Sequence, residues 1–128
     1  VVNHRFGEIN ILFNVKDLDR SERFYRDVMG LMVVRHHSEA DGDWLSADVR
    51  EGLVLIFFSG EEPIGRSPIV VFGLDEGGID SVVETLAANG VEMVTPVSEA
   101  PGGWSTDFRD PDGHPLAFYQ TDDLPRRR

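Results

Sequence analysis

The sequence repeats one succession of structural signals, and this repeat constrains the fold more than any other feature. In each half, an apolar strand-like run is followed by apolar residues at helical spacing and then by a glycine. The runs cover 11–15 and 69–74, and the closing glycines are Gly30 and Gly90. These glycines lie 60 positions apart. The two halves therefore predict two copies of one supersecondary unit.

Three strand-like segments follow each predicted helix, which makes the order βαβββ in both halves. They cover roughly 31–38, 43–49 and 52–59 in the first half, and roughly 91–96, 104–109 and 114–121 in the second. Asp41-Gly42 suits a tight hairpin, and the run 110–113 places Pro and Gly where a tight turn uses them. We therefore expect an α+β fold of two modules, rather than one sheet whose halves match by chance.

Each predicted helix has one apolar face that should pack against the strands. The first stripe consists of Leu18, Ser21, Phe24, Tyr25, Val28 and Met29, and the second of Ile79, Val82, Val83, Leu86 and Ala87. We expect a core between helix and sheet that includes Phe13, Phe24, Phe72, Leu86 and Phe118.

The 128 residues are enough to bury a core in one domain without covalent crosslinks. We expect a single domain over 1–128, with a first module at about 8–60 and a linker at 60–68. The second module covers about 68–122, and a basic tail covers 123–128.

Composition excludes several classes of protein. The formal net charge is −11 even though the last three residues are arginines, and so acidic a body repels nucleic acid, whose phosphates require clustered cations. With no cysteine there is no thiolate site, and Lys16 as the only lysine makes a Schiff-base enzyme improbable. No apolar run is long enough for a membrane span, and we expect a cytoplasmic protein. The acidic charge would attract a cationic small molecule, although it also serves solubility.

Two segments resemble the signatures of the vicinal oxygen chelate superfamily, which contains glyoxalases, bleomycin resistance proteins and extradiol dioxygenases. Residues 13–31 match its opening strand, Val-x-Asp-Leu step, helical Ser and Phe-Tyr pair, and 108–116 contain its Asp-Pro-Asp-Gly turn. The resemblance implies that the four strands of each module form a curved mixed sheet with the helix outside. Paired modules enclose a ligand cavity, either within one chain or across a dimer, and we expect a homodimer.

The resemblance also identifies four positions where metal-dependent relatives place His, Gln or Glu ligands. In this chain they hold Asn10, Ile56, Ile69 and Ala117. A catalytic divalent metal needs about three strong nitrogen or oxygen ligands, which this set does not supply. We therefore expect no metal and no cofactor. We expect His4, His36, His37 and His114 to be surface or hydrogen-bonding residues.

Alternation along the strands predicts which side chains face the cavity. The set is Asn10, Leu12, Asn14, Ile56, Phe58, Ile69, Val71, Ala117 and Tyr119, with Trp44, Trp104 and Phe108 on its wall or rim. Such an apolar pocket with a few polar groups is typical of a small-molecule site, and its rings suit a flat or cationic ligand. Alternatively, Trp44 and Trp104 cover the rim or a dimer interface, and Tyr119 is a satisfied buried tyrosine.

Three arginines offer a different ligand chemistry, because Arg35, Arg50 and Arg109 could bind an anion instead.

The sequence as a whole leaves three hypotheses about function. The first is a metal-free protein that binds a small organic molecule, cationic or aromatic, and sequesters a drug as antibiotic resistance proteins do. The second is an enzyme of the same superfamily, a lyase, isomerase or dioxygenase with an atypical or relocated metal site. The third is a structural or regulatory partner module without a ligand.

Overall fold

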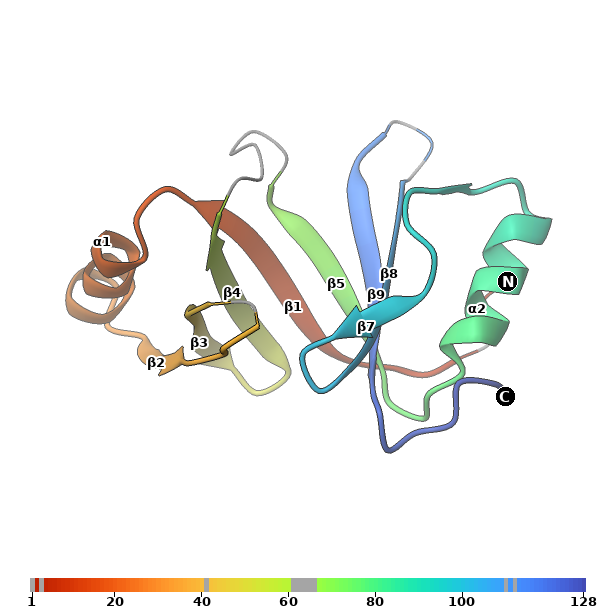
Figure 1. Cartoon of the computed structure of the whole chain (residues 1–128), viewed down its shortest axis with the longest axis horizontal. Coiled ribbons are helices and arrows are strands. Elements are labelled where there is room, and N and C mark those ends of the chain that lie inside the picture. Colours follow the sequence, from red (N-terminus) through yellow and green to blue (C-terminus); the bar gives the residue numbers. More distant parts are fainter. Residues whose placement is uncertain (1, 3, 41, 61–66, 110, 112) are drawn as a thin grey trace. The chain divides into compact units, whose positions relative to one another are not determined.

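The chain folds into two compact units in the computed structural model, which describes residues 2, 4–40, 42–60, 67–109, 111 and 113–128 (Figure 1). One unit, Asn10–Ile69, contains helix α1 (Leu18–Arg23) and is called the α1 unit. The other, Val1–Ile9 with Val70–Arg128, contains helix α2 (Ile79–Ala88) and is called the α2 unit. Asp41, Asp110, Asp112 and the central part of the expected linker, 61–66, lie outside the described residues.

The α1 unit follows the predicted βαβββ order. Its elements are the second part of β1 (Phe6–Val15), α1, the π-helical turn η1 (Phe24–Val28), β2 (Met32–His36), β3 (Trp44–Arg50) and β4 (Leu53–Ser59). The strands are ordered β2-β3-β4-β1. β3 is antiparallel to both β2 and β4, with an irregularity between Asp48 and Arg50.

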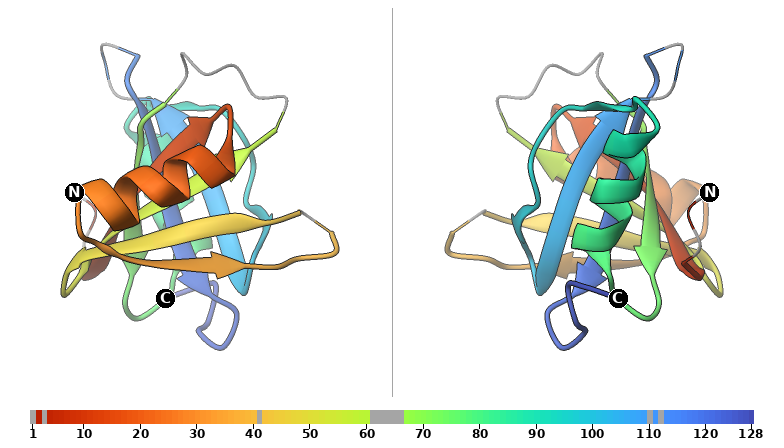
Figure 2. Two further views of the ribbon diagram at one scale, coloured as in Figure 1. Left: turned by 90° about the vertical axis from the view of Figure 1, so that its left-hand side faces the viewer. Right: turned by 90° about the vertical axis from the view of Figure 1, so that its right-hand side faces the viewer.

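The core of the α1 unit forms where α1 meets the strands (Figure 2). Asp17 caps the helix, because its side chain accepts the N–H of Arg20 at 3.1 Å. Leu18 then packs with Leu45, Ala47 and the fully buried Phe57. The rings of Phe13 and Tyr25 lie 5.3 and 4.5 Å from the ring of Phe57, which centres the core on that side chain.

The α2 unit also begins with a strand and a helix. It contains the first part of β1, β5 (Ile69–Leu74), α2, β6 (Glu92–Met93), β7 (Ser98–Ala100), β8 (Gly103–Arg109) and β9 (Pro115–Thr121). The order is β1-β5-β9-β8-β6, with β7 also paired to β8, and β5 is parallel to β9. The sequence predicted one strand over 91–96, but β6 covers only two of these residues, and β7 forms after Pro96, outside the predicted range.

The core of the α2 unit lies between α2 and its strands, as the right-hand view in Figure 2 shows. Ile79, Val82 and Leu86 of the helix pack with Phe108 and Phe118 of the strands. The helix begins without a capping side chain of its own. Instead, the side-chain oxygen Oε1 of buried Gln120 accepts a hydrogen bond from the backbone N–H of Ile79 at 2.9 Å, so β9 supplies the missing cap.

The expected basic tail is tied to the α2 unit. Arg126 donates to Asp80 at 2.9 Å, and its guanidinium lies 4.2 Å from the ring centre of Trp104. Arg127 donates to Glu84 at 2.6 Å. Both acidic residues belong to α2, so the segment that follows β9 packs along this helix.

The predicted apolar stripe of the first helix is partly wrong. Leu18 and Tyr25 pack in the core as expected, but Phe24 is 46% exposed and Val28 is 71% exposed. The reason is that α1 changes into the wider turn η1, in which the N–H of Met29 bonds the carbonyl five residues earlier. That turn shifts Val28 away from the stripe. Phe24, at the start of the turn, lies about 120° around the helix from Leu18, whereas Tyr25 lies about 20° from it. The expected core positions of Phe13, Phe72, Leu86 and Phe118 are confirmed.

Removing the central ring of the α1 unit should destabilise the protein strongly. We expect Phe57→Ala to lower the free energy of unfolding by about 3–5 kcal/mol, because it opens a cavity beneath Phe13 and Tyr25. Met32→Ala, at a side chain that is 71% exposed, should change it by less than about 0.5 kcal/mol. Urea unfolding followed by circular dichroism measures both, and equal effects would contradict the assigned core.

Candidate functional site

One face of the strands in the α1 unit is left open by α1. Leu45, Ala47 and Phe57 pack toward the helix, so alternation directs their neighbours to the opposite face. That face carries Trp44 paired with Phe58, and Ser46 paired with Ile56, across β3 and β4. The predicted direction of Trp44, Ile56 and Phe58, away from the helix, agrees with this arrangement.

Three rings form a row across this open face. The His36 ring stacks on Trp44 with centroids 3.9 Å apart and planes at 16°, and the Trp44 ring lies 5.8 Å from Phe58. All three side chains are half-buried, and Nε2 of His36 lies 2.8 Å from Oγ of Ser46. We call His36, Trp44 and Phe58 the aromatic row. It offers π surface for a flat ligand and one polar pair at its edge.

Sequence reasoning assigned Trp44 and Phe58 to this face but missed His36 and Ser46. The signal was present in the hairpin register, because β2 and β3 pair His36 directly with Trp44. Adjacent strand residues point to opposite faces, so only His36, and not Arg35, can join the row. His36 is a hydrogen-bonding residue, as predicted.

Strand β1 contributes the other three candidates of the α1 unit. Phe13 and Val15 pack with the helix, so Leu12 and Asn14 lie on the opposite face, and alternation places Asn10 with them. The backbone N–H of Asn14 donates to Oγ of Ser67 at 3.2 Å. Asn10 is only 6% exposed, and its Oδ1 has no hydrogen-bond partner within the described part of the chain.

In the α2 unit, the face opposite α2 carries Val71 next to Ala117 in the parallel pair of β5 and β9. Tyr119 lies further along the same face, and its hydroxyl donates to the carbonyl of Pro101 at 2.7 Å. Burial raises the pKa of Tyr119, and the negative charges of nearby acidic residues, first Asp122, add to the effect. The hydroxyl therefore remains a proton donor at neutral pH. Ile69, at the start of β5, is half-buried.

The expected place of Trp104 and Phe108 on the cavity wall is corrected by the structure. Phe108 is buried against α2 and stacks on Phe118 at 4.9 Å. Trp104 packs against the same core and lies beneath Arg126. These two residues have the helix-facing phase of β8, so alternation gives the open face to Ser105 and Asp107 instead. The sequence alternates apolar Trp104 and Phe108 with polar residues, but this alternation does not say whether the apolar side faces the helix or a cavity.

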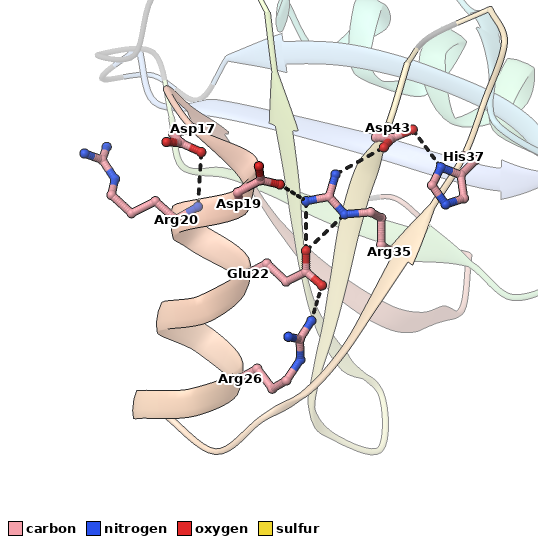
Figure 3. A network of polar contacts seen from close by, with 8 residues as sticks. All are labelled: Asp17, Asp19, Arg20, Glu22, Arg26, Arg35, His37 and Asp43. Carbon is pink, nitrogen blue, oxygen red and sulfur yellow. Dashed lines mark hydrogen bonds and ion pairs between the residues drawn. The ribbon is translucent and has the colours of Figure 1, made fainter.

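Arg35 serves the fold rather than an anionic ligand, which corrects that alternative for this residue (Figure 3). It reaches from β2 toward α1, where it donates to Asp19 at 2.6 Å and to Glu22 at 2.8 and 3.0 Å. A further bond of 3.1 Å joins it to Asp43, which also contacts His37 at 2.9 Å. The guanidinium donors are thus directed at carboxylates.

The other two arginines differ from Arg35. Arg109 donates to the carbonyl of Gly113 at 3.2 Å and lies 3.9 Å from Glu92, and Arg50 is exposed at the end of β3.

The network around Arg35 also lowers the pKa of one of its carboxyl groups, that of Glu22. Hydrogen bonds from Arg35, and then from Arg26, hold the pKa of Glu22 below its ordinary value, against the opposing effect of partial burial.

The four positions where relatives hold a metal do not fit a divalent ion here. Asn10 has one neutral oxygen to offer, and Ile56, Ile69 and Ala117 have no donor atom in their side chains. Within the described ranges, no group of three His, Asp or Glu side chains is placed to hold an ion. The donor set thus falls short of three strong ligands.

Among the described residues, no helix has the length and apolarity to cross a membrane.

An open groove of about 640 Å³ lies beside α2, away from the strand faces. Its lining consists of His4, Ser81, Glu84, Thr85, Ala88, Arg127 and Arg128. Arg127 is paired with Glu84, and Arg128 with Glu76. The groove follows from the packing of the tail along the helix, and it contains none of the predicted ligand residues.

Comparison with known proteins identifies one family and several solved structures of similar fold. Residues 6–118 match the model of the Glyoxalase/Bleomycin resistance protein/Dioxygenase superfamily. The match covers both strand–helix repeats and the turn between β8 and β9.

Similar solved structures include a hypothetical protein from Bacillus halodurans C-125, with a TM-score of 0.72 and 17% identity over 96% of this chain and 98% of that one. A methylmalonyl-CoA epimerase variant from Streptomyces coelicolor, bound to 2-nitronate-propionyl-CoA, has a TM-score of 0.69 and 17% identity over 93% and 98%. A protein described as an NAD-dependent benzaldehyde dehydrogenase from Legionella pneumophila has a TM-score of 0.69 and 20% identity over 89% and 99%. These TM-scores show a shared fold.

The Arg35 network should make the protein sensitive to acid. Because the folded state lowers the pKa of Glu22, its stabilisation is complete above the ordinary value of 4.5 and is lost as the pH falls through the folded value. We expect Arg35→Met to be less stable than the wild type at pH 7, with a difference that shrinks at pH 3.5. Urea unfolding at both pH values measures this. Arg50→Met is the control, and a difference independent of pH would contradict the assigned cause.

Proposed function

Because the chain belongs to the Glyoxalase/Bleomycin resistance protein/Dioxygenase superfamily, we propose that it is a metal-independent member that binds a small organic molecule. One observation carries the proposal: the four positions that hold metal ligands in relatives contain Asn10 and three aliphatic side chains. Without strong donors, a Lewis-acid step at these positions has no ion to support it. The open strand faces remain, and their chemistry is that of a binding surface.

The aromatic row supports a flat, aromatic ligand. Its half-buried rings expose π surface, and the His36–Ser46 pair at 2.8 Å offers a polar contact at the edge. The net charge of −11 favours a cation over an anion, and a cation also interacts favourably with an aromatic face. Arg35 adds no competing anion site, because it is surrounded by Asp19, Glu22 and Asp43. We therefore propose a cationic, planar organic ligand.

Sequestration of a drug is the role that we propose for such binding, because it requires affinity and no chemical step.

We further propose that two copies associate as a homodimer. Support comes from apolar side chains on the surface of the α1 unit, where Val28, Met29 and Met32 are all more than half exposed. Exposed apolar groups of this kind commonly mark contact surfaces.

Ligand binding should not depend on a metal ion. We expect protein purified without chelators to contain no stoichiometric Zn, Ni, Mn or Fe, and its affinity for cationic aromatic antibiotics to be unchanged by EDTA. Elemental analysis and isothermal titration calorimetry measure these quantities. Stoichiometric metal that is lost together with a catalytic activity would contradict the proposal and favour an enzyme with a relocated metal site. Failure of the whole panel to bind would remove the resistance role.

Trp44 should contribute directly to ligand affinity. We expect Trp44→Ala to weaken the binding of a planar cationic antibiotic about tenfold, since stacking and cation–π contacts are lost. Val49→Ala is the control, because this exposed residue lies at the irregular end of β3, at the opposite end of the strand from Trp44. Titration calorimetry on both variants gives the ratio of dissociation constants. If the two variants bind equally well, the aromatic row is not the binding surface.

A further inference from the structure

The open face of the α1 unit continues along the strands beyond the aromatic row. β2, β3 and β4 pair without a shift as far as Asp48, so every second residue of each strand lies on this face. The strands therefore place three rows of side chains there, which are His36–Trp44–Phe58, Val34–Ser46–Ile56 and Met32–Asp48–Val54. The third row puts a carboxylate between two apolar side chains, on the same face as the aromatic rings.

Asp48 differs from the carboxylates on the other side of the strands. Those that surround Arg35 receive its hydrogen bonds (Figure 3). Asp48 is the only acidic residue in β2, β3 and β4, and it forms no hydrogen bond or ion pair within the described part of the chain, not even with nearby Arg50. Aspartate is also disfavoured in strands. Neither strand propensity nor an internal ion pair therefore accounts for this carboxylate.

A ligand can reach Asp48 from solvent. The residue is exposed, and Met32 beside it is 71% exposed. Trp44, Ser46 and Asp48 follow one another on the same strand and face, and the rows that flank them supply mostly apolar contacts. The carboxylate and the aromatic row are thus two ends of one accessible surface within the α1 unit.

The register fixes the distance between these two ends. Trp44 and Asp48 are four residues apart on β3, so their side chains leave the sheet roughly 13 Å apart at about 3.3 Å per residue. A cation in contact with the carboxylate takes up about 3 Å of this length, and a ring beside Trp44 takes up about 4 Å. A ligand that touches both needs roughly 6–10 Å between its ring and its cation, depending on whether the ring lies beside or over Trp44.

We propose that Asp48 is the counter-charge for the ligand's cationic group, and that the ligand is an elongated amine whose planar ring and ammonium group are joined by an apolar spacer. The inference rests on the proposed function and names the chemical class of its ligand. A cation held by the aromatic row alone would need no spacer, whereas a cation at Asp48 requires one.

The size of the effect follows from the exposure of Asp48. An ion pair at a surface changes an affinity by no more than about fivefold, because water and salt screen it. The net charge of −11 attracts any cation to the whole molecule, whatever its length. The contribution of Asp48 is therefore recognised by its dependence on spacer length, and not by the preference for cations as such.

The test uses the full chain and two matched pairs of probes. The long pair is 6-(1-naphthyl)hexylammonium and the uncharged 6-(1-naphthyl)hexan-1-ol, whose spacer is roughly 8 Å long because single bonds of about 1.5 Å advance about 1.3 Å per methylene. The short pair is 1-naphthylmethylammonium and 1-naphthylmethanol, whose polar groups do not reach Asp48 when the ring lies on the aromatic row. Within each pair, the ratio of the two affinities measures the preference for the cation.

We expect Asp48→Asn to lower the cation preference of the long pair about three- to fivefold and that of the short pair by less than about 1.5-fold. Asp48→Glu retains the charge and should retain the long-pair preference. Asp27→Asn is the matched control, because it removes one exposed charge from η1, which packs on the other face of the strands, and it should leave both preferences unchanged. Titration calorimetry gives the affinities, and Tm of each variant should stay within about 2 °C of the wild type.

The outcomes separate this inference from the proposed function. If Asp48→Asn lowers the cation preference of both pairs equally, or if Asp27→Asn lowers it as much, the charge acts through the overall field and the inference is wrong. If Asp48→Asn changes neither preference, the carboxylate serves solubility alone, and the inference is wrong while the binding function stands. If none of the four probes binds the wild type, the proposed function fails and the inference fails with it.

Discussion

The packing of each helix against one face of its strands decides which residues are free to meet a ligand. In the α1 unit, the side chains of Leu45, Ala47 and Phe57 pack against α1. Their immediate neighbours along the same strands therefore point to the opposite face. The aromatic row lies on that opposite face because the alternate residues of its strands pack against the helix. In the α2 unit the same rule assigns Phe108 to the core and leaves its neighbours on β8 facing away from the helix. The candidate surfaces are thus consequences of core packing.

The sequence predicted the element order well, because the repeat depends on local signals that survive tertiary packing: apolar runs, helical spacing and closing glycines. It predicted strand phase less reliably. The face of Trp44, away from α1, was predicted correctly, whereas Trp104 packs toward α2, because the apolar alternation of β8 does not say which of its faces meets the helix. Val28 was misjudged for a different reason, because the change from α1 to η1 depends on a hydrogen bond between residues five apart, which the residue pattern does not indicate.

Strand β2 shows how two adjacent residues can serve separate purposes. Arg35 points toward α1 and holds the helix through Asp19 and Glu22, while His36 points away and stacks on Trp44. Because both side chains leave one short strand, the network that fastens the helix also fixes the position of the ring next to it. The orientation of the aromatic row is therefore coupled to ion pairs on the reverse side of the strand, which salt and acid weaken.

The two tryptophans lie one in each compact unit, and their surroundings differ. Trp44 is half-buried and stacked with an imidazole, whereas Trp104 packs on the α2 core with a guanidinium over its ring. Each indole is therefore an intrinsic optical reporter for its own half of the chain. Emission from a variant that retains one of them distinguishes opening of the α1 unit from opening of the α2 unit, so cooperativity between the halves becomes measurable without any added label.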